Sequence, residues 1–493
     1  MNTSMINRLE ELIVRNNRNA SHETAAAVLQ DLGTACISFA ILDHHNITSH
    51  CITSGSEDTS TLFQACSISK SVCALLIFKL IESGHLSLHT SISAYLPKEE
   101  VDKLETPETK GMAKFITISM LLSHTSGLET SGVYGFPGYD LSRNANGHFR
   151  AALPELKEAL EGGWPSNTLP IRLKDWPGHN FNYSGGGYEI LQLIIEEVMK
   201  KPLAQVMQEY VFTPLGMKRS TFAVPDDEDL NTKRQQGKGN YARAHYNGYT
   251  ACEAPHRVNP EQSAAGLWST PTDLLILVSA IQKSLHNESG LLPQHLAKQM
   301  LEEVMSTMAH GWFVTNTHFG HSGSNVPGWK CNVMASLDGN QGFCFMVNSL
   351  EGDPVGYKME AAMSYLLGWK KAKEFLYMRT CIPFADVSAT PPDTAVIEKW
   401  NGMWKEKGTQ FKVEFLAQEG VPCLKVGQMP EQWLWIAAHG EEEYQDGGRI
   451  VADLVCRGGM EVLVRLIESS NSEALMEMWN GNTGKKVVME RVS

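Results

Sequence analysis

Ser67 and Lys70 stand three residues apart where an apolar run begins, and this spacing could activate a serine. The run over residues 69–80 predicts a mostly buried helix that stops near Gly84. If Ser67 opens that helix, both side chains share one face and the amine lies beside the hydroxyl. A serine hydroxyl becomes a good nucleophile when a base takes its proton, and a desolvated lysine can be that base. The pair therefore indicates covalent chemistry at Ser67.

The start of the same helix could stabilise a negative charge. Its first backbone N–H groups lack partners within the helix and carry positive dipole character, which favours a developing oxyanion. Ser-x-x-Lys spacing is also expected by chance about once or twice in a chain of this length. The interpretation therefore depends on further motifs elsewhere in the chain.

Two other polar side chains lie next to features that could place them near a buried site. His124 follows a predicted helix over residues 116–122 and could be a general base. Turns of this kind use such side chains to bond their own backbone, which favours a structural histidine. Tyr183 precedes a glycine triplet at residues 185–187, after which no lysine follows as a P-loop requires. The triplet instead predicts a close backbone approach, with Tyr183 pointing into the site.

The composition limits the possible functions. A chain of 493 residues is too long for one core, so two or three domains are expected. The net charge of −13 argues against nucleic acid or an anionic membrane as a partner. Ten cysteines without paired spacing predict free thiols in a reducing compartment, and hence a cytoplasmic location.

Neither a targeting segment nor a metal site is predicted. Residues 1–17 have apolar residues at helical spacing, which indicates an amphipathic surface helix rather than a signal peptide. No run is long and apolar enough to span a bilayer. His44 and His45 lie in a predicted turn with no further ligand nearby, so a solvated turn is favoured over a metal site. We expect no cofactor.

The pattern of elements predicts two different parts. Residues 36–42 and 47–52 flank a polar turn and predict a β-hairpin, and short strands are expected between residues 311 and 348. Residues 381–394 contain three prolines and predict a linker. Seven alternating segments between residues 411 and 492 predict a small antiparallel β-domain, barrel-like by its even strand spacing. His439 is its single histidine, and no partner residue suggests a catalytic role for it. The expected domains are residues 1–380 and 395–493.

Six blocks in order resemble one known family: residues 61–70, 122–128, 183–185, 214–217, 264–268 and 319–325. Over roughly residues 5 to 375, the chain is similar to the serine β-lactamase-related hydrolases. That family includes class C β-lactamases, penicillin-binding DD-peptidases, and their esterase and acyltransferase relatives. The resemblance implies an α+β fold, in which an antiparallel sheet with flanking helices adjoins a helical lobe and Ser67 lies at the junction. A small antiparallel β-barrel, lipocalin-like as in some relatives, would follow.

The resemblance also implies roles for individual residues. Ser67 would be the acylated nucleophile, Lys70 its partner, and Tyr183 the proton relay. The backbone N–H groups of Ser67 and Ser324 would form the oxyanion hole. The remaining candidates are predicted to bind substrate: Gly185, His321, Ser322, Gly323 and Asn325.

Two of these candidates indicate which substrates are preferred. His321, Ser322 and Gly323 occupy the place of the family's Lys-Thr-Gly strand, in the form common among esterase-like relatives. Gly185 stands where the family usually has an asparagine, and it either removes a polar contact or provides a left-handed backbone. We therefore expect esters or thioesters to be preferred over β-lactams and peptides.

The predicted function is a serine hydrolase that acts through an acyl-enzyme on an ester, thioester or small amide. Three alternatives stay open: an acyltransferase or peptide cyclase/thioesterase of a biosynthetic pathway, a D-aminopeptidase or β-lactamase, and an inactive binding protein. The expected partner is a small-molecule, peptidyl or acyl substrate, possibly bound to a carrier protein. The sequence leaves the oligomeric state open.

Overall fold

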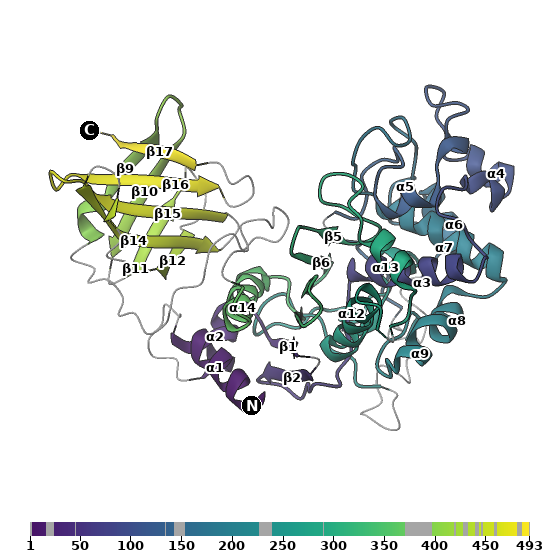
Figure 1. The fold of residues 1–493 in the computed structure, drawn as a ribbon, viewed down its shortest axis with the longest axis horizontal. Coiled ribbons are helices and arrows are strands. Elements are labelled where there is room, and N and C mark those ends of the chain that lie inside the picture. The colour runs from purple at the N-terminus through teal and green to yellow at the C-terminus, as the bar shows by residue number, and fades with distance from the viewer. Residues whose placement is uncertain are drawn as a thin grey trace. The chain divides into compact units, whose positions relative to one another are not determined.

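The structure is a computed structural model that describes residues 2–15, 24–44, 46–133, 135–141, 153–225, 239–288, 290–369, 397–418, 421–426, 432–438, 443–444, 447–457, 461–480 and 486–492 (Figure 1). It divides into two compact units, Gly33–Gly352 and Met1–Leu32 with Asp353–Ser493. The predicted linker and both predicted domain boundaries at residues 380 and 395 lie outside the described residues, as does His439, so these remain predictions.

The first unit contains a six-stranded antiparallel sheet in the order β2-β1-β8-β7-β6-β5. Its strands are β1 (Cys36–Asp43), β2 (Asn46–Thr53), β5 (Phe313–Val314), β6 (His318–Asn325), β7 (Trp329–Ser336) and β8 (Gln341–Val347). The predicted hairpin over residues 36–52 and the strands predicted after residue 311 are confirmed within a few residues at each end. Pairing of β1 with β8 joins segments about 300 residues apart in sequence.

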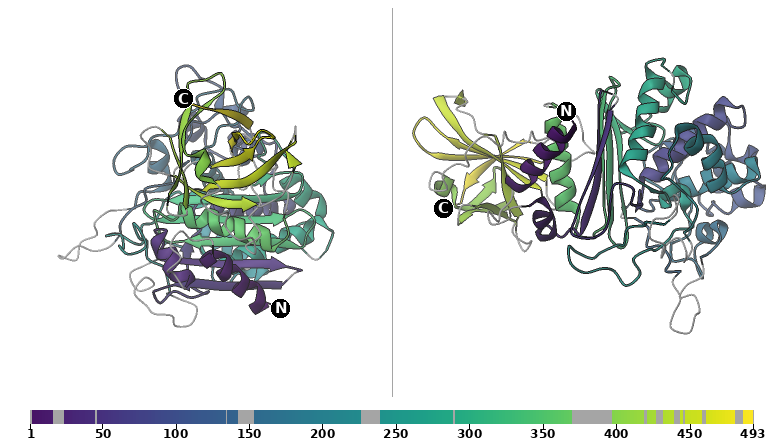
Figure 2. Two further views of the ribbon diagram at one scale, coloured as in Figure 1. Left: turned by 90° about the vertical axis from the view of Figure 1, so that its left-hand side faces the viewer. Right: turned by 90° about the horizontal axis from the view of Figure 1, so that it is seen from below.

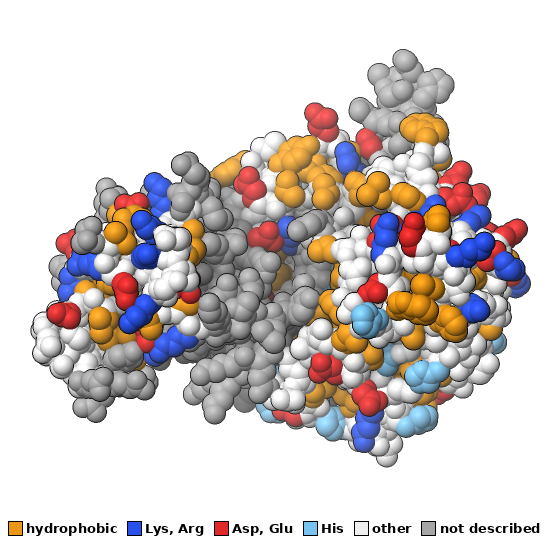
Figure 3. Space-filling view, turned by 90° about the horizontal axis from the view of Figure 1, so that it is seen from above, with side chains coloured by type: hydrophobic (Ala, Val, Ile, Leu, Met, Phe, Trp, Pro, Cys, Tyr) orange, Lys and Arg blue, Asp and Glu red, His pale blue; other side chains and the backbone are white. Residues whose placement is uncertain are grey.

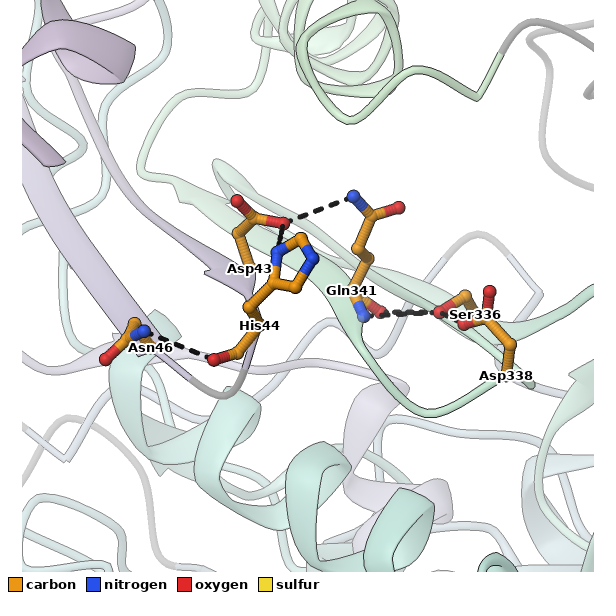
Figure 4. Close-up of polar contacts among 6 residues, drawn as sticks. All are labelled: Asp43, His44, Asn46, Ser336, Asp338 and Gln341. Atoms are coloured by element: carbon orange, nitrogen blue, oxygen red, sulfur yellow. Dashed lines mark hydrogen bonds and ion pairs between the residues drawn. The ribbon is translucent and has the colours of Figure 1, made fainter. Parts of the chain in front are cut away.

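Two hairpin turns lie next to each other at one end of the strands β1 and β8 (Figure 4). Asp43 Oδ1 lies 2.9 Å from His44 Nδ1 and accepts a hydrogen bond from Gln341 Nε2 at 3.2 Å. The Gln341 N–H in turn donates to Ser336 Oγ at 3.2 Å. These bonds connect the β1–β2 turn to the β7–β8 hairpin. His44, the turn histidine that the structure describes, therefore contacts a neighbouring side chain of its own turn.

Helices pack against the sheet and extend into a helical lobe (Figure 2). α12 (Pro271–Leu285) contacts β1, β2, β7 and β8, and its Thr270 side chain caps the helix by accepting from the Asp273 N–H. The other principal helices are α3 (Ile68–Glu82), α4 (Lys98–Asp102), α5 (Ile118–Leu122), α6 (Leu156–Glu161), α7 (Gly185–Met199), α8 (Leu203–Met207), η3 (Gln208–Phe212), α9 (Thr213–Leu215), α11 (Gln262–Ala265) and α13 (Gln294–Met300).

The central helix α3 is buried almost all round, from Ile68 to Phe78, as a uniformly apolar helix must be. It contacts β6 and β7 of the sheet as well as α11 and α13 of the helical part. Its first turn therefore lies where the sheet and the helices meet, which is the position expected for Ser67.

The second unit contains a closed antiparallel barrel. Its strands are β9 (Gly402–Glu406), β10 (Lys412–Gln418), β11 (Val421–Lys425), β12 (Gln432–Ala438), β13 (Glu443–Tyr444), β14 (Gly448–Arg457), β15 (Glu461–Glu468), β16 (Ala474–Asn480) and β17 (Lys486–Arg491). Sequential neighbours pair except β12 and β13: β12 pairs with β14, and the two-residue β13 adds to β14 beside it. β17 returns to β9, so eight strands form a ring. The seven predicted segments are all strands, and β9 and the two-residue β13 are additional. A specific relation to lipocalins remains a prediction.

Helices complete the second unit. The predicted N-terminal helix is α1 (Asn2–Arg15), which packs with α14 (Asp353–Leu366) and buries Leu9 and Ile13 completely. α2 (Ala25–Asp31) follows it. Among the described residues, no helix is both long and apolar enough to cross a membrane. On the face drawn in Figure 3, the described basic and acidic side chains are interspersed.

Candidate active site

Ser67 lies at a sharp turn between a short strand and the central helix. β3 (Phe63–Gln64) pairs with β4 (Trp268–Ser269) and leads to Cys66, whose φ of 48° is in the left-handed region. Ser67 occupies the N-cap of α3, but its side chain makes no capping bond, so the hydroxyl is not used to hold the helix. Such backbone strain at a non-glycine residue is typical of functional sites. The turn presents Ser67 Oγ at the start of the helix.

Lys70 lies beside Ser67 as the helical spacing predicted, with 3.1 Å between Lys70 Nζ and Ser67 Oγ. The amine also donates to the Ala264 carbonyl at 2.7 Å, and the whole side chain is buried. Burial lowers the pKa of Lys70 to about 7, although the nearby Glu189 carboxyl acts in the opposite direction. A substantial fraction of Lys70 is therefore a free amine near neutral pH. That amine can donate to Ala264 and still accept the Ser67 proton.

Tyr183 lies over the Lys70 amine, whose nitrogen is 5.1 Å from the centre of the Tyr183 ring. The ring of His124 packs against that of Tyr183, with 4.3 Å between ring centres and 30° between the ring planes. The Ser184 N–H donates to His124 Nδ1 at 3.1 Å, and the Asn182 N–H donates to the His124 carbonyl at 2.8 Å. His124 thus binds the segment that carries Tyr183 at three successive residues. This supports the structural interpretation of His124 over the general-base one.

The electrostatics of His124 agree with a positioning role. Burial lowers the pKa of His124 well below its usual value, and the Lys70 charge lowers it further. The residue has a φ of 58°, in the left-handed region. Its neutral ring, protonated at Nε2, leaves Nδ1 to accept the Ser184 N–H.

The strand β6 brings the other candidate residues to the site. A Cβ on Gly323 would lie 2.7 Å from Ser67 N and 2.8 Å from Cys331 Sγ, so the strand can approach the nucleophile this closely only with glycine there. Ser322 is exposed and Ser324 is half-buried. A role of the Ser324 N–H in an oxyanion hole, with that of Ser67, remains a prediction.

His321 is a buried, neutral side chain. Its Nδ1–H donates to the Ser322 carbonyl at 2.6 Å. Burial, together with the nearby Lys70 charge, lowers the pKa of His321 to about 3. The ring lies near Tyr183, with 6.4 Å between the two ring centres. At neutral pH this position therefore supplies no positive charge to a substrate.

Asn325 connects three segments around the site. Its Nδ2 donates to Gln64 Oε1 at 2.8 Å and to the Ala265 carbonyl at 3.0 Å, and its Oδ1 accepts from the Phe136 N–H at 3.5 Å. The side chain is buried. These bonds hold β3, α11 and the loop of Phe136 together, while direct binding of substrate by Asn325 remains a prediction.

Gly185 begins α7 and has no left-handed backbone, so a requirement for positive φ does not explain this glycine. The explanation is steric: a Cβ at residue 185 would lie 2.6 Å from Cζ of Phe136. The next glycine, Gly186, meets Ile171 in the same way, at 2.5 Å. The predicted close approach therefore holds for Gly185 and Gly186, where it involves side chains from other segments, but not for Gly187, whose Cβ would meet its nearest atom at 3.6 Å.

Sequence reasoning missed several residues near Lys70. Glu189 interacts electrostatically with Lys70, and Glu261 interacts with Glu189. Both are buried, and burial raises the pKa of Glu189 well above its usual value and that of Glu261 to about 7. The Ala264 carbonyl and the ring of Phe136 were also missed. Ala264 lies in the block of residues 264–268, which does not indicate a role for its carbonyl, and no sequence signal singles out Glu189, Glu261 or Phe136, because they reach the site only through packing. Among the described residues, no group of three or more His, Cys, Asp or Glu side chains could hold a metal ion.

The fold and the placement of Ser67 define a class: α+β proteins with a Ser-x-x-Lys helix between an antiparallel sheet and a helical lobe. The family model described as beta-lactamase matches residues 26–365, and the chain belongs to this family. Its members with known activity include serine hydrolases. The sequence identity between this chain and individual members of the family is low.

Protein flp of Staphylococcus aureus (strain MW2) is 24% identical over 297 residues, which are 59% of this chain and 53% of that protein. Esterase EstB of Burkholderia gladioli is 25% identical over 254 residues, 48% of this chain and 60% of that protein. The chain thus spans little more than half the length of these relatives. The octameric penicillin-binding protein homologue from Pyrococcus abyssi is similar in structure, with a TM-score of 0.58 at 17% identity, over 98% of this chain and 100% of that chain.

Proposed function

We propose that this protein is a serine hydrolase that forms an acyl-enzyme at Ser67 and prefers neutral esters. The observation that carries the proposal is the 3.1 Å contact between Lys70 Nζ and Ser67 Oγ inside a buried site. A lysine held this way, with a pKa of about 7, has the property that a general base needs near neutral pH.

The reaction would proceed in two steps. Lys70 takes the Ser67 proton as Oγ bonds to the ester carbonyl carbon, and the oxyanion is stabilised by the N–H groups of Ser67 and Ser324. The proton then passes to the leaving alkoxide through Lys70 and Tyr183, as the ester C–O bond breaks. In the second step, water attacks the acyl-enzyme by the same route and releases the acid and free Ser67.

The charges around the site support neutral substrates. The neutral imidazole of His321 gives a substrate carboxylate no cationic partner, and Gly185 with Phe136 presents no amide group beside Lys70. A buried substrate amide without a partner costs about 1–3 kcal/mol, so amides are disfavoured relative to esters. The printed name of one relative, Esterase EstB, agrees with this preference.

The acceptor of the acyl group is a separate question, since water and another nucleophile would release the same intermediate. An acyltransferase or peptide cyclase therefore remains the alternative, with a carrier thioester as donor. Adding amines or alcohols to the hydrolysis reaction distinguishes the two, because a transferase forms the amide or ester product at the expense of the free acid.

Covalent labelling tests the proposal. A fluorophosphonate should add one group to the full chain, peptide mapping should place it on Ser67, and p-nitrophenyl esters of short acids should be hydrolysed. Ser67→Ala should lose both labelling and hydrolysis, while Ser69→Ala, two residues along the same helix, should keep them. Labelling that survives in Ser67→Ala would overturn the proposal.

A further inference from the structure

The amine of Lys70 is surrounded by aromatic rings. The centres of the Tyr183, Tyr188 and Phe136 rings lie 5.1, 5.8 and 6.0 Å from Lys70 Nζ. Tyr188 donates its hydroxyl to the Leu122 carbonyl and belongs to the same helix as Gly185. Phe136 differs from both tyrosines because it comes from a separate loop and brings no polar group.

Glycines in two separate segments make room for the Phe136 ring. A Cβ on Gly132 would lie 2.5 Å from Cε2 of this ring, and a Cβ on Gly185 would lie 2.6 Å from its Cζ. The ring is buried, with 2% of the residue exposed. Any side chain at either position would have to displace it. The place beside Gly185 is therefore occupied by an apolar ring.

The backbone of the same loop is held against the end of β6. The Val326 N–H donates to the Phe136 carbonyl at 3.2 Å, and the Phe136 N–H donates to Asn325 Oδ1 at 3.5 Å. Gly135 has a φ of 89°, and a Cβ there would lie 2.4 Å from the Ser324 carbonyl. Phe136 thus has a fixed position between β6 and α7.

We propose that Phe136 is a positioning residue for Lys70: its ring fills the space that Gly185 leaves open and excludes water from the amine. The amine then stays a free base directed at Ser67. This inference rests on the proposed function, in which Lys70 accepts the Ser67 proton. A water molecule in that space would hydrate the ammonium form and favour it, which would weaken the base.

The Phe136 ring has two opposing effects on the pKa of Lys70. Its π-electrons attract an ammonium ion, but at 6.0 Å the contact lies at the outer limit of such interactions, about 6 Å. Dehydration acts the other way, and burial is the largest cause of the fall in the Lys70 pKa from 10.5 to about 7. Removing the ring should therefore raise the Lys70 pKa. The other titratable groups around the amine are Cys66, Cys73, His124, Tyr183, Tyr188, Glu189 and His321, and Glu261 acts on Glu189.

The test is the pH dependence of Ser67 acylation by an activated ester in Phe136→Ala. We expect its acidic limb to move up by about one pH unit or more, with acylation at neutral pH falling about fivefold or more and recovering in alkali. Phe136→Leu, which keeps apolar volume, should move the limb back toward the wild-type position. Phe212→Ala makes a comparable cavity away from the amine, where Phe212 stacks on Phe222, and should leave the limb in place.

Glycine variants on α7 test the contact between the Phe136 ring and Gly185 without changing Phe136. Gly185→Ala should displace the ring and move the limb upward, whereas Gly187→Ala should not, because its Cβ would meet its nearest atom at 3.6 Å. In the Phe136→Ala background, Gly185→Ala should add no further shift, since the ring is gone. If Phe136→Ala does not fold, the Gly185→Ala and Gly187→Ala pair decides the question.

The inference is overturned if the acidic limb of the pH profile stays in place or moves down in Phe136→Ala. If Phe136→Ala does not fold, the same result in Gly185→Ala overturns it. This outcome is separate from failure of the proposed function, which would appear as wild-type protein that is not labelled at Ser67. Wild-type labelling at Ser67 with an unmoved limb rejects the role of Phe136 alone.

Discussion

The surroundings of Ser67 and the interior of the C-terminal barrel are both well buried, but they bury different chemistry. Around Ser67 the buried side chains include Lys70, His124 and His321, and the buried Glu189 carboxyl interacts with Lys70. The described core of the barrel consists of apolar side chains such as Trp404, Phe415, Leu466 and Met476. Burying an ionisable group is costly unless the group is neutralised or partnered. A cluster of such groups therefore marks the region where chemistry, and not only stability, determines the residues.

The backbone shows the same contrast. Cys66 and His124 have positive φ beside the nucleophile and beside Tyr183. In the barrel, the strands pair antiparallel around a ring, and the positive φ of Ser472 lies in the turn between β15 and β16. A ring of this kind satisfies its backbone mainly with neighbouring strands, whereas the site keeps left-handed residues beside reactive side chains, where packing must hold them. Substitutions in the two regions should accordingly differ in whether they alter catalysis or only stability.

The largest effect is expected from the proton relay. Lys70→Ala and Tyr183→Phe should each lower turnover by about 10² to 10⁴. The double variant should lose little more than either single variant, because the two residues act as one unit. Hydrolysis rates of the four proteins, measured on one ester, give the comparison. Losses that multiply would mean that the two residues act independently.

A somewhat smaller effect is expected from Gly323→Ala. The new Cβ would meet Ser67 N and Cys66 Cβ at 2.7 Å, so β6 must move away from the nucleophile. We expect acylation to fall by roughly 10² to 10³, the usual loss when an oxyanion donor is displaced. Gly342→Ala on β8 is a control in the same sheet, where the nearest atom is the Met334 carbonyl oxygen at 3.0 Å. Equal losses in both variants would point to a general effect on the sheet.

The pH dependence of the wild type should follow Lys70. Because the free amine is the active form and its pKa is about 7, kcat/KM should rise through neutral pH and then level off. Below that pKa the rate should fall about tenfold for each pH unit. The profile of kcat/KM for a neutral ester measures this directly. A limb centred near the ordinary lysine value would show that burial does not tune Lys70.

The smallest effect on catalysis is expected from the barrel. Trp404 is fully buried there and donates its Nε1–H to the Trp400 carbonyl at 2.8 Å. Trp404→Ala should destabilise the barrel by about 3–5 kcal/mol but leave the rate of Ser67 labelling by small reagents unchanged below the melting transition. Thermal unfolding and labelling of one preparation test both halves of this statement. Slower labelling of the folded variant would show that the barrel contributes to acylation.

Local geometry made parts of this molecule predictable. Ser67 and Lys70 lie side by side because residues three apart share a helix face, wherever the helix is placed. The β1–β2 hairpin and the barrel strands follow from alternating patterns and short turns. The likeness of six ordered motifs to one family then indicated the fold and the order of the site residues.

The tertiary structure alone decided what surrounds the amine. Phe136, Ala264 and Glu189 come from segments far from Lys70 in sequence, and no periodicity connects them to it. The same holds for Gly185. A side chain at this position would collide with the ring of Phe136, which lies 49 residues earlier in the sequence. Sequence patterns report short-range geometry, whereas the dehydration that makes Lys70 a base arises from long-range packing. That packing follows from the combined shapes of many side chains and from no single motif.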